Sequence, residues 1–327
     1  MAQKIYITGG AGYVGSLLVP TLLEKGYDVT IIDLMIYGEE MVGNHPNLTK
    51  INGDIRDTKL MEETIPGHDT LIHLACISND PSFELNPDLG KSINLDPFEP
   101  MVKIAKESSV NRFIYASSAS VYGIKDIPNV TEDVELEPLT DYSIFKAQCE
   151  TILDTYKSDN FTTLVIRPAT LCGYAKRLRL DLTVNILTNF AINKGGITVF
   201  GGEQKRPNLH IKDMVRLYCE VIELPSEKIN GKIYNAGYEN FKVKDIAQMV
   251  KNVIGDDVTI TTTPTDDNRS YHVSSEKIKN ELGFVPKYSI EDAVQGLKDA
   301  FDAGLIPNSF EDDVYVNVKR MNNIKLS

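Results

Sequence analysis

The segment YITGGAGYVGS, residues 6–16, carries four glycines between two apolar runs. Glycine is unfavourable inside a strand or a helix, so this cluster predicts a turn that joins one to the other. The spacing is GxxGxxG. Gly9 would allow a tight turn, Gly12 the close approach of a pyrophosphate, and Gly15 close packing of the helix on the strand. The free N–H groups and the dipole at the start of the helix would hold the anion.

Short apolar runs alternate with longer segments of helical periodicity through the first half of the chain. Strands are expected over residues 4–8, 28–33, 47–53, 70–75, 111–117 and 162–168, and helices over 13–25, 98–108 and 142–157. This alternation predicts an α/β fold: a Rossmann-type, doubly wound parallel sheet with helices on both faces.

The pattern changes after about residue 168, where Gly, Pro and Arg become frequent. We expect an NAD-binding domain over residues 1–175, to which a segment of about 210–240 returns. Residues 176–327 would form a smaller, mixed and mainly substrate-binding region, interleaved with the first. The tail after Leu305 has little pattern and is expected to wrap the surface.

The composition excludes several classes of function. Hydrophobic residues make up 42% of the 327 residues, which is ordinary for a globular protein. The net charge of −12 argues against a nucleic-acid partner. The apolar runs are too short to span a membrane, and residues 1–10 do not resemble a signal peptide, so we expect a soluble, cytoplasmic protein. The four cysteines lie far apart, and no spacing indicates a metal site.

Acidic residues follow the second and third expected strands. Asp33 ends the second strand about 20 residues after the glycine turn, where a carboxylate binds the adenosine ribose and repels a 2′-phosphate. This position favours NAD over NADP; the alternative is a simple turn residue. Asp54 could bind the adenine amine, with Ile55 beside the ring, or it could cap a helix.

The segments YASSASVYG (115–123) and DYSIFKA (141–147) supply groups for acid–base chemistry. Tyr142 and Lys146 are four residues apart and would share a helix face. An ammonium beside a phenol stabilises the phenolate; lowering the phenol pKa from about 10 to near 7 requires about 4 kcal/mol. The phenolate would take the proton of a substrate hydroxyl as hydride leaves its carbon, and Ser118 would hold the same oxygen.

This order of motifs resembles the extended short-chain dehydrogenase/reductase family, the nucleotide-sugar epimerases and dehydratases, over nearly the whole chain. The resemblance implies that Ser118, Tyr142 and Lys146 are catalytic, and that a homodimer forms through helices of about 90–106 and 142–157. It further implies that the NAD contacts are Gly9, Gly12, Tyr13, Val14, Gly15, Asp33, Asp54, Ile55, Leu74, Ala75, Asn94, Tyr142 and Lys146.

The residues after Ser118 bear on the reaction that the resemblance implies. Family members that dehydrate, and many that decarboxylate, carry an acid two places after the catalytic serine or threonine, whereas this chain has Ala119 and Ser120. We therefore expect epimerisation by transient oxidation at C4. The alternative is a net C4 dehydrogenase of a nucleotide-activated sugar or heptose. A non-enzymatic, dinucleotide-sensing scaffold is disfavoured because the catalytic set is complete.

The resemblance also implies a nucleotide diphosphate sugar as substrate. Arginines suit its phosphates because they form bidentate hydrogen bonds. The RxRxD segment formed by Arg177, Arg179 and Asp181 is less usual, and it could bind phosphate or form a salt-bridge cluster at a helix entry. The substrate-binding candidates are Ser78, Asn79, Ser118, Arg177, Arg179, Asn185, Arg206 and Arg269.

Overall fold

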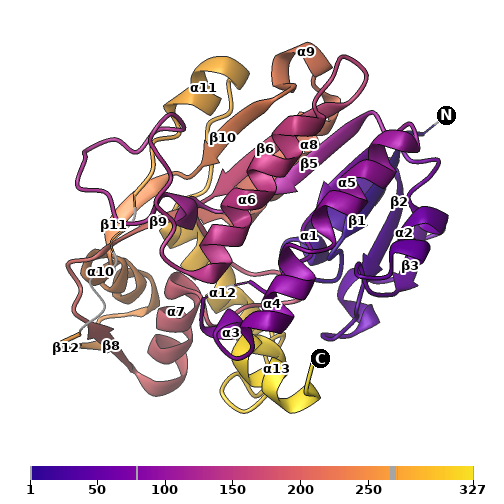
Figure 1. The fold of residues 1–327 in the computed structure, drawn as a ribbon. Helices are drawn as coiled ribbons and strands as arrows, with labels where there is room; N and C mark the ends of the chain where they lie inside the picture. Colours follow the sequence, from indigo (N-terminus) through magenta and orange to yellow (C-terminus); the bar gives the residue numbers. More distant parts are fainter. Residues whose placement is uncertain (1, 79, 266–269, 271, 327) are drawn as a thin grey trace.

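A seven-stranded parallel sheet forms the centre of the protein (Figure 1). The computed structural model describes residues 2–78, 80–265, 270 and 272–326. The strand order is β10-β6-β5-β4-β1-β2-β3. The strands are β1 (Lys4–Thr8), β2 (Asp28–Asp33), β3 (Leu48–Asn52), β4 (Thr70–His73), β5 (Arg112–Ala116), β6 (Thr162–Pro168) and β10 (Lys232–Ala236). The order reverses between β1 and β4, where ligands bind in folds of this kind.

Helices cover both faces of the sheet, because successive strand residues point to opposite sides. Ile5 and Ile7 of β1 pack into one hydrophobic core and Tyr6 into the other. The first face carries α1 (Gly15–Glu24), α8 (Ile211–Glu223), α9 (Ser226–Ile229) and α11 (Glu276–Leu282). The second carries α2 (Thr58–Thr64), α3 (Asp80–Phe83), α4 (Pro87–Asn94), α5 (Phe98–Glu107) and α6 (Asp141–Tyr156). The predicted doubly wound α/β fold is confirmed.

A smaller, mixed region lies beyond the carboxyl ends of the central strands. One sheet has the order β11-β9-β7, and β8 pairs with β12. Its strands are β7 (Thr170–Cys172), β8 (Gly196–Phe200), β9 (Lys205–His210), β11 (Glu239–Lys242) and β12 (Thr259–Thr263). Its core is built from α7 (Thr183–Lys194), α10 (Val243–Ile254) and α12 (Ile290–Asp302).

The C-terminal tail does more than wrap the surface. After the short turn η3 (Asp313–Tyr315) it forms α13 (Asn317–Ile324), which lies beside α3 (Figure 1). Asn317 and Met321 of this helix line a cavity of about 430 Å³ at the carboxyl ends of the central strands. The expectation of a patternless tail was therefore wrong, because a helix of eight residues is too short to show clear periodicity. Among the described residues, no helix is long and apolar enough to cross a bilayer.

Candidate active site

One cavity of about 430 Å³ lies at the carboxyl ends of the central strands and reaches into the smaller region. It brings together most of the residues that the sequence singles out. Those that line it are Gly9, Gly12, Tyr13, Val14, Gly15, Asp33, Asp54, Ile55, Leu74, Ala75, Ser78, Ser118, Tyr142, Lys146, Arg177, Arg179 and Arg206. Residues far apart in the sequence therefore share this cavity, from Gly9 near the start to Leu326 near the end.

The glycine turn is packed so that side chains are excluded from it. Gly9 has a φ of +72°, and a Cβ there would lie 2.6 Å from the backbone nitrogen of Ala75. A Cβ on Gly15 would lie 2.1 Å from the carbonyl oxygen of Gly10. A Cβ on Gly12 would meet only the Gly9 oxygen, at 3.2 Å. The absence of a side chain at Gly12 therefore keeps the cavity open at the start of α1. This cradle fits the diphosphate of a dinucleotide.

Asp33 is tied across the glycine turn. Its carboxylate accepts hydrogen bonds from the backbone N–H of Ala11 (3.0 Å) and of Met35 (2.8 Å). Burial raises the pKa of Asp33, and the two backbone donors and the Arg177 guanidinium act in the opposite direction. The carboxylate is thus held in place at the rim of the turn.

Asp54 is not a helix cap. Its carboxylate accepts hydrogen bonds from the backbone N–H of Arg56 (2.8 Å) and from its guanidinium (2.6 and 2.9 Å). Burial would raise the pKa of Asp54, but these bonds hold it below its usual value. The residue that caps α2 is Asp57, which accepts from the N–H of Leu60 at 3.1 Å. Asp54 therefore faces the cavity as an ionised group.

Ser118, Tyr142 and Lys146 meet at the end of β5. A capping box of Thr140 and Ser143 begins α6 and sets the direction of Tyr142. Lys146 is buried; its Nζ donates a 2.6 Å hydrogen bond to the carbonyl of Ala116 and lies 5.9 Å from the centre of the Tyr142 ring.

The phenol of Tyr142 lies in a dry environment. Burial raises its pKa, and so do the nearby Cys76 and Asp80; the hydroxyl of Ser118 and the charge of Arg179 lower it. The net direction is upward, whereas the sequence predicted a lowered pKa through Lys146. The difference arises because the ammonium of Lys146 is directed at a backbone carbonyl and lies some distance from the ring. The positive charge of Lys146 does act on His73. Burial and this charge together lower the pKa of His73 to about 3.

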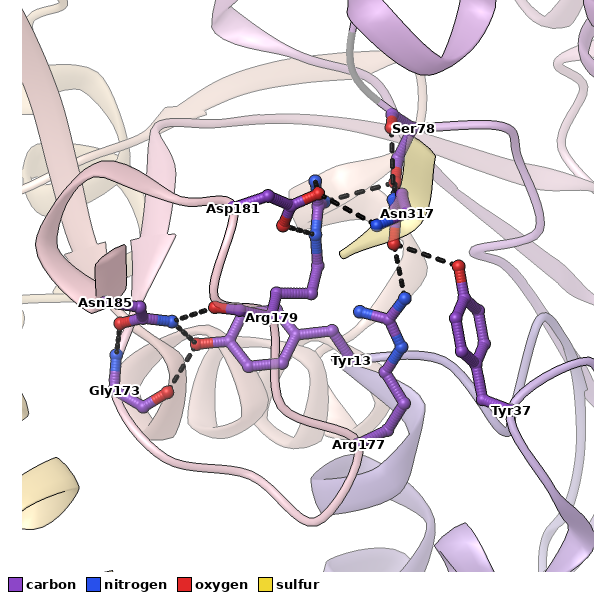
Figure 2. A network of polar contacts seen from close by, with 9 residues as sticks. All are labelled: Tyr13, Tyr37, Ser78, Gly173, Arg177, Arg179, Asp181, Asn185 and Asn317. Atoms are coloured by element: carbon purple, nitrogen blue, oxygen red, sulfur yellow. Dashed lines mark hydrogen bonds and ion pairs between the residues drawn. The ribbon is translucent and has the colours of Figure 1, made fainter. Parts of the chain in front are cut away.

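Two asparagines that were expected to touch ligands bind the backbone. The amide of Asn94 pairs with both backbone groups of Ile77, at 2.8 and 3.0 Å, and so fixes the segment after β4. The amide of Asn185 accepts from Gly173 N–H (2.9 Å) and donates to Arg179 O (2.8 Å) and to the Tyr13 hydroxyl (3.2 Å) (Figure 2). These bonds give both amides a structural role. Their contact with cofactor or substrate stays a prediction.

The RxRxD segment forms a buried network with the C-terminal helix (Figure 2). Arg179 binds both carboxylate oxygens of Asp181, at 2.9 and 3.2 Å, and donates to the hydroxyl of Ser78 at 3.1 Å. Arg177 stacks on the ring of Tyr37 at 3.6 Å and donates to Asn317. Sequence reasoning missed Tyr37 and Asn317, because neither belongs to a motif.

The remaining substrate candidates are distributed around the cavity. Arg206 lies on β9 at the cavity wall, and its Nη1 donates to the carbonyl of Lys205 at 3.0 Å. Asn79 and Arg269 lie outside the described residues. Cys76 and Asp80 also line the cavity.

A family model, that of the NAD dependent epimerase/dehydratase family, matches residues 5–237. The chain belongs to this family. A UDP-glucose 4-epimerase from Corynebacterium glutamicum is 27% identical over 89% of this chain and 94% of its own. A UDP-N-acetyl-alpha-D-glucosaminuronate decarboxylase from Bacillus cytotoxicus is 28% identical over 91% and 97%. The family resemblance predicted from the sequence is thus confirmed.

Solved structures support the fold of this family member. The UDP-glucose 4-epimerase of Thermotoga maritima, solved with UDP-glucose, superposes with a TM-score of 0.84 at 24% identity over 93% of this chain and 100% of that chain. A dTDP-glucose 4,6-dehydratase from Streptomyces venezuelae, solved with NAD, gives 0.83 at 21% identity over 95% and 100%. Family members with different reactions thus share this architecture, so the reaction has to be argued from the site.

Proposed function

We propose that the protein is an NAD-dependent nucleotide-sugar epimerase that acts by transient oxidation at C4. One observation carries this proposal: a single cavity joins Ser118, Tyr142 and Lys146 to the glycine turn and Asp33. A hydroxyl-bearing substrate that enters from the smaller region would thus reach the phenol and the dinucleotide site together.

The residues of the site fit NAD, with Gly12 and the start of α1 at its diphosphate and Asp33 at its ribose. When bound, NAD supplies a hydride acceptor beside the sugar and returns the hydride after the sugar has turned over. The chain itself must bind, orient and deprotonate the hydroxyl.

Tyr142 is the proposed base. In its ionised form it takes the hydroxyl proton, and it gives the proton back when the hydroxyl is reformed on the other face. Ser118 is placed to hold the reacting oxygen, and the hydroxyl of Ser120 donates to that of Ser118 at 2.9 Å. Lys146 supplies the positive charge that favours phenolate, which must outweigh the upward effect of burial on the Tyr142 pKa.

The positions after Ser118 favour epimerisation over dehydration. Ala119 and Ser120 begin the turn η2 (Ala119–Tyr122), and neither can donate a proton to a departing C6 hydroxyl at neutral pH. Asp80 also lines the cavity, and its charge raises the pKa of Tyr142. Its carboxylate accepts a 2.7 Å hydrogen bond from Thr140, the cap of α6, and so supports the start of the helix that carries Tyr142.

A nucleotide diphosphate sugar is the proposed substrate. Arg206 offers a cationic group on the wall formed by the smaller region, and Ser78 offers a hydroxyl near the sugar. The names of the relatives, which include UDP-glucose 4-epimerases, agree with this class.

The test is incubation with a panel of UDP-, GDP-, CDP- and dTDP-sugars. We expect interconversion of a C4 pair with no build-up of NADH at 340 nm. Stoichiometric NADH with release of a keto-sugar would instead show the net C4 dehydrogenase. No conversion of any sugar, with NAD bound, would contradict both.

A homodimer completes the proposal. Between α5 and α6 the surface is hollowed, with Leu95, Glu99 and Ile152 among the lining residues. Light scattering should give twice the mass of one chain. A measured mass equal to that of one chain, at micromolar concentration, would contradict the proposed homodimer.

A further inference from the structure

Arg177 holds a position that the proposed function leaves without a role. It follows β7 in the smaller region, yet its backbone N–H donates a 3.2 Å hydrogen bond to the hydroxyl of Ser16, in the first turn of α1. Its side chain is 3% exposed and lines the cavity beside the ring of Tyr37 (Figure 2). The guanidinium thus lies between the glycine turn and the C-terminal helix.

The guanidinium of Arg177 is incompletely paired. Nη2 donates to the side-chain oxygen of Asn317, but Nε and Nη1 have no hydrogen-bond partner among the residues that the structure describes. A buried charge with unsatisfied donors costs several kcal/mol, so a native site of this kind needs a compensating group.

No carboxylate of the described residues supplies this compensation by direct contact. Asp181 is engaged by both sides of the Arg179 guanidinium and accepts from the backbone N–H of Asn317 at 3.3 Å. Asp33 accepts two backbone hydrogen bonds. Tyr37 offers a cation–π contact from its ring and a phenol, which is neutral in its ordinary form. The two free N–H directions therefore fit an anion that enters the cavity.

We propose that Arg177 binds the diphosphate of the dinucleotide cofactor, beside the start of α1. The alternative anion is the diphosphate of the sugar substrate. The anchoring of Arg177 on Ser16 favours the cofactor, because Ser16 follows directly after the glycine cradle. Arg206, the arginine assigned to the substrate, lies instead on β9 of the smaller region.

The C-terminal helix holds this arginine in place. Asn317, the first residue of α13, accepts from the Tyr37 hydroxyl at 2.9 Å and from Arg177, and its amide donates to the carbonyl and hydroxyl oxygens of Ser78 at 3.2 and 3.0 Å (Figure 2). One side chain thus links the segment after β2, the segment after β4 and Arg177. We expect this link to slow the dissociation of the cofactor.

The test compares Arg177→Met with Arg206→Met, a matched change at the arginine assigned to the substrate. Each protein is freed of bound nucleotide and titrated by calorimetry with NAD, ADP-ribose and UDP. For Arg177→Met we expect NAD and ADP-ribose to bind about 10- to 100-fold more weakly, with UDP unchanged. For Arg206→Met we expect weaker binding of UDP, with the affinities for NAD and ADP-ribose unchanged. An NAD affinity within about twofold of the parent, or a loss confined to UDP, would overturn the proposal.

A melting experiment separates binding from folding. Because the charge of Arg177 is buried and incompletely paired, Arg177→Met without ligand should melt at or above the parent temperature, while its stabilisation by NAD shrinks. A ligand-free protein that is much less stable would show a structural role instead. Arg177→Lys keeps the charge and loses the planar donors, so its NAD affinity should fall between those of the parent and Arg177→Met. The inference rests on NAD as cofactor, but its binding readouts do not depend on which sugar is converted.

Discussion

The ammonium of Lys146 donates a 2.6 Å hydrogen bond to the backbone carbonyl of Ala116, the last residue of β5. This bond fixes the buried lysine between the strand end and the ring of Tyr142. The lysine acts on the phenol as a charge held at a set distance, since the bond to Ala116 fixes the ammonium 5.9 Å from the centre of the ring. Removing the phenol and removing the charge should therefore have separable effects.

Tyr142→Phe removes the proposed base and leaves the ring packing intact. We expect kcat to fall about 10²- to 10⁴-fold, because general-base catalysis contributes that much. The affinity for NAD should change little. This affinity can be measured by displacing NADH with NAD and following the fluorescence of NADH. An activity near that of the parent would show that another group takes the proton.

The value of kcat/KM should rise with pH. The base must be ionised, and burial raises the pKa of Tyr142, so below that pKa the fraction of phenolate grows about tenfold per pH unit. A plot of log kcat/KM against pH should thus have a rising limb of slope one. Lys146→Met should move this limb to higher pH, because the charge that favours phenolate is gone. A limb that stays in place would exclude electrostatic tuning by Lys146.

A buried ion pair supports the catalytic strand end from behind. Arg167 binds the carboxylate of Glu150 at 2.6 Å through Nη2, and Ser117, next to Ser118, donates to the same carboxylate. Glu150→Ala should lower the free energy of unfolding by about 3–5 kcal/mol, since it leaves an unpaired buried arginine. Urea denaturation measures this loss. The exposed pair of Glu276 and Lys279 offers a control, and Glu276→Ala should cost at most about 1 kcal/mol.

The sequence predicted the central sheet closely because most of its strands are short segments rich in apolar, β-branched residues. The expected strands over residues 4–8, 28–33 and 162–168 agree with β1, β2 and β6 residue by residue. The motif residues follow from the same pattern, since parallel strands bring their carboxyl ends to one edge.

The network around Asn317 was beyond such reasoning. Asn317 and Ser78 are 239 residues apart, and their hydrogen bonds depend on how α13 folds back over the cavity. For Asn94 and Asn185, the motif position predicts ligand contact, and the structure adds hydrogen bonds from both amides to nearby backbone groups that no motif indicates. A polar residue near a site satisfies backbone groups as readily as ligands, and only coordinates distinguish the two.

Gly15→Ala tests the fit of the glycine cradle. Its Cβ would lie 2.1 Å from the carbonyl oxygen of Gly10, so the turn would have to shift. We expect weaker NAD binding and a lower melting temperature. Gly296→Ala is the matched control on α12, where a Cβ meets nothing within 4 Å. That change should stabilise the protein by about 0.4–1 kcal/mol, because alanine favours the helix. Equal melting temperatures for the two variants would contradict the close packing of the turn.

Asp33→Asn tests the choice of cofactor. The side-chain oxygen of asparagine can still accept from the N–H of Ala11 or Met35, but the charge that would repel a 2′-phosphate is removed. We expect the preference for NAD over NADP to fall about tenfold or more, since two charges some 4 Å apart interact by about 1–4 kcal/mol. The measurement is the ratio of the two dissociation constants. Asp54→Asn, which removes an ionised carboxylate from the same cavity, should leave that ratio unchanged because Asp54 follows β3 and is assigned to the adenine. If both changes lowered the ratio equally, the general charge of the cavity, and not Asp33, would select the cofactor.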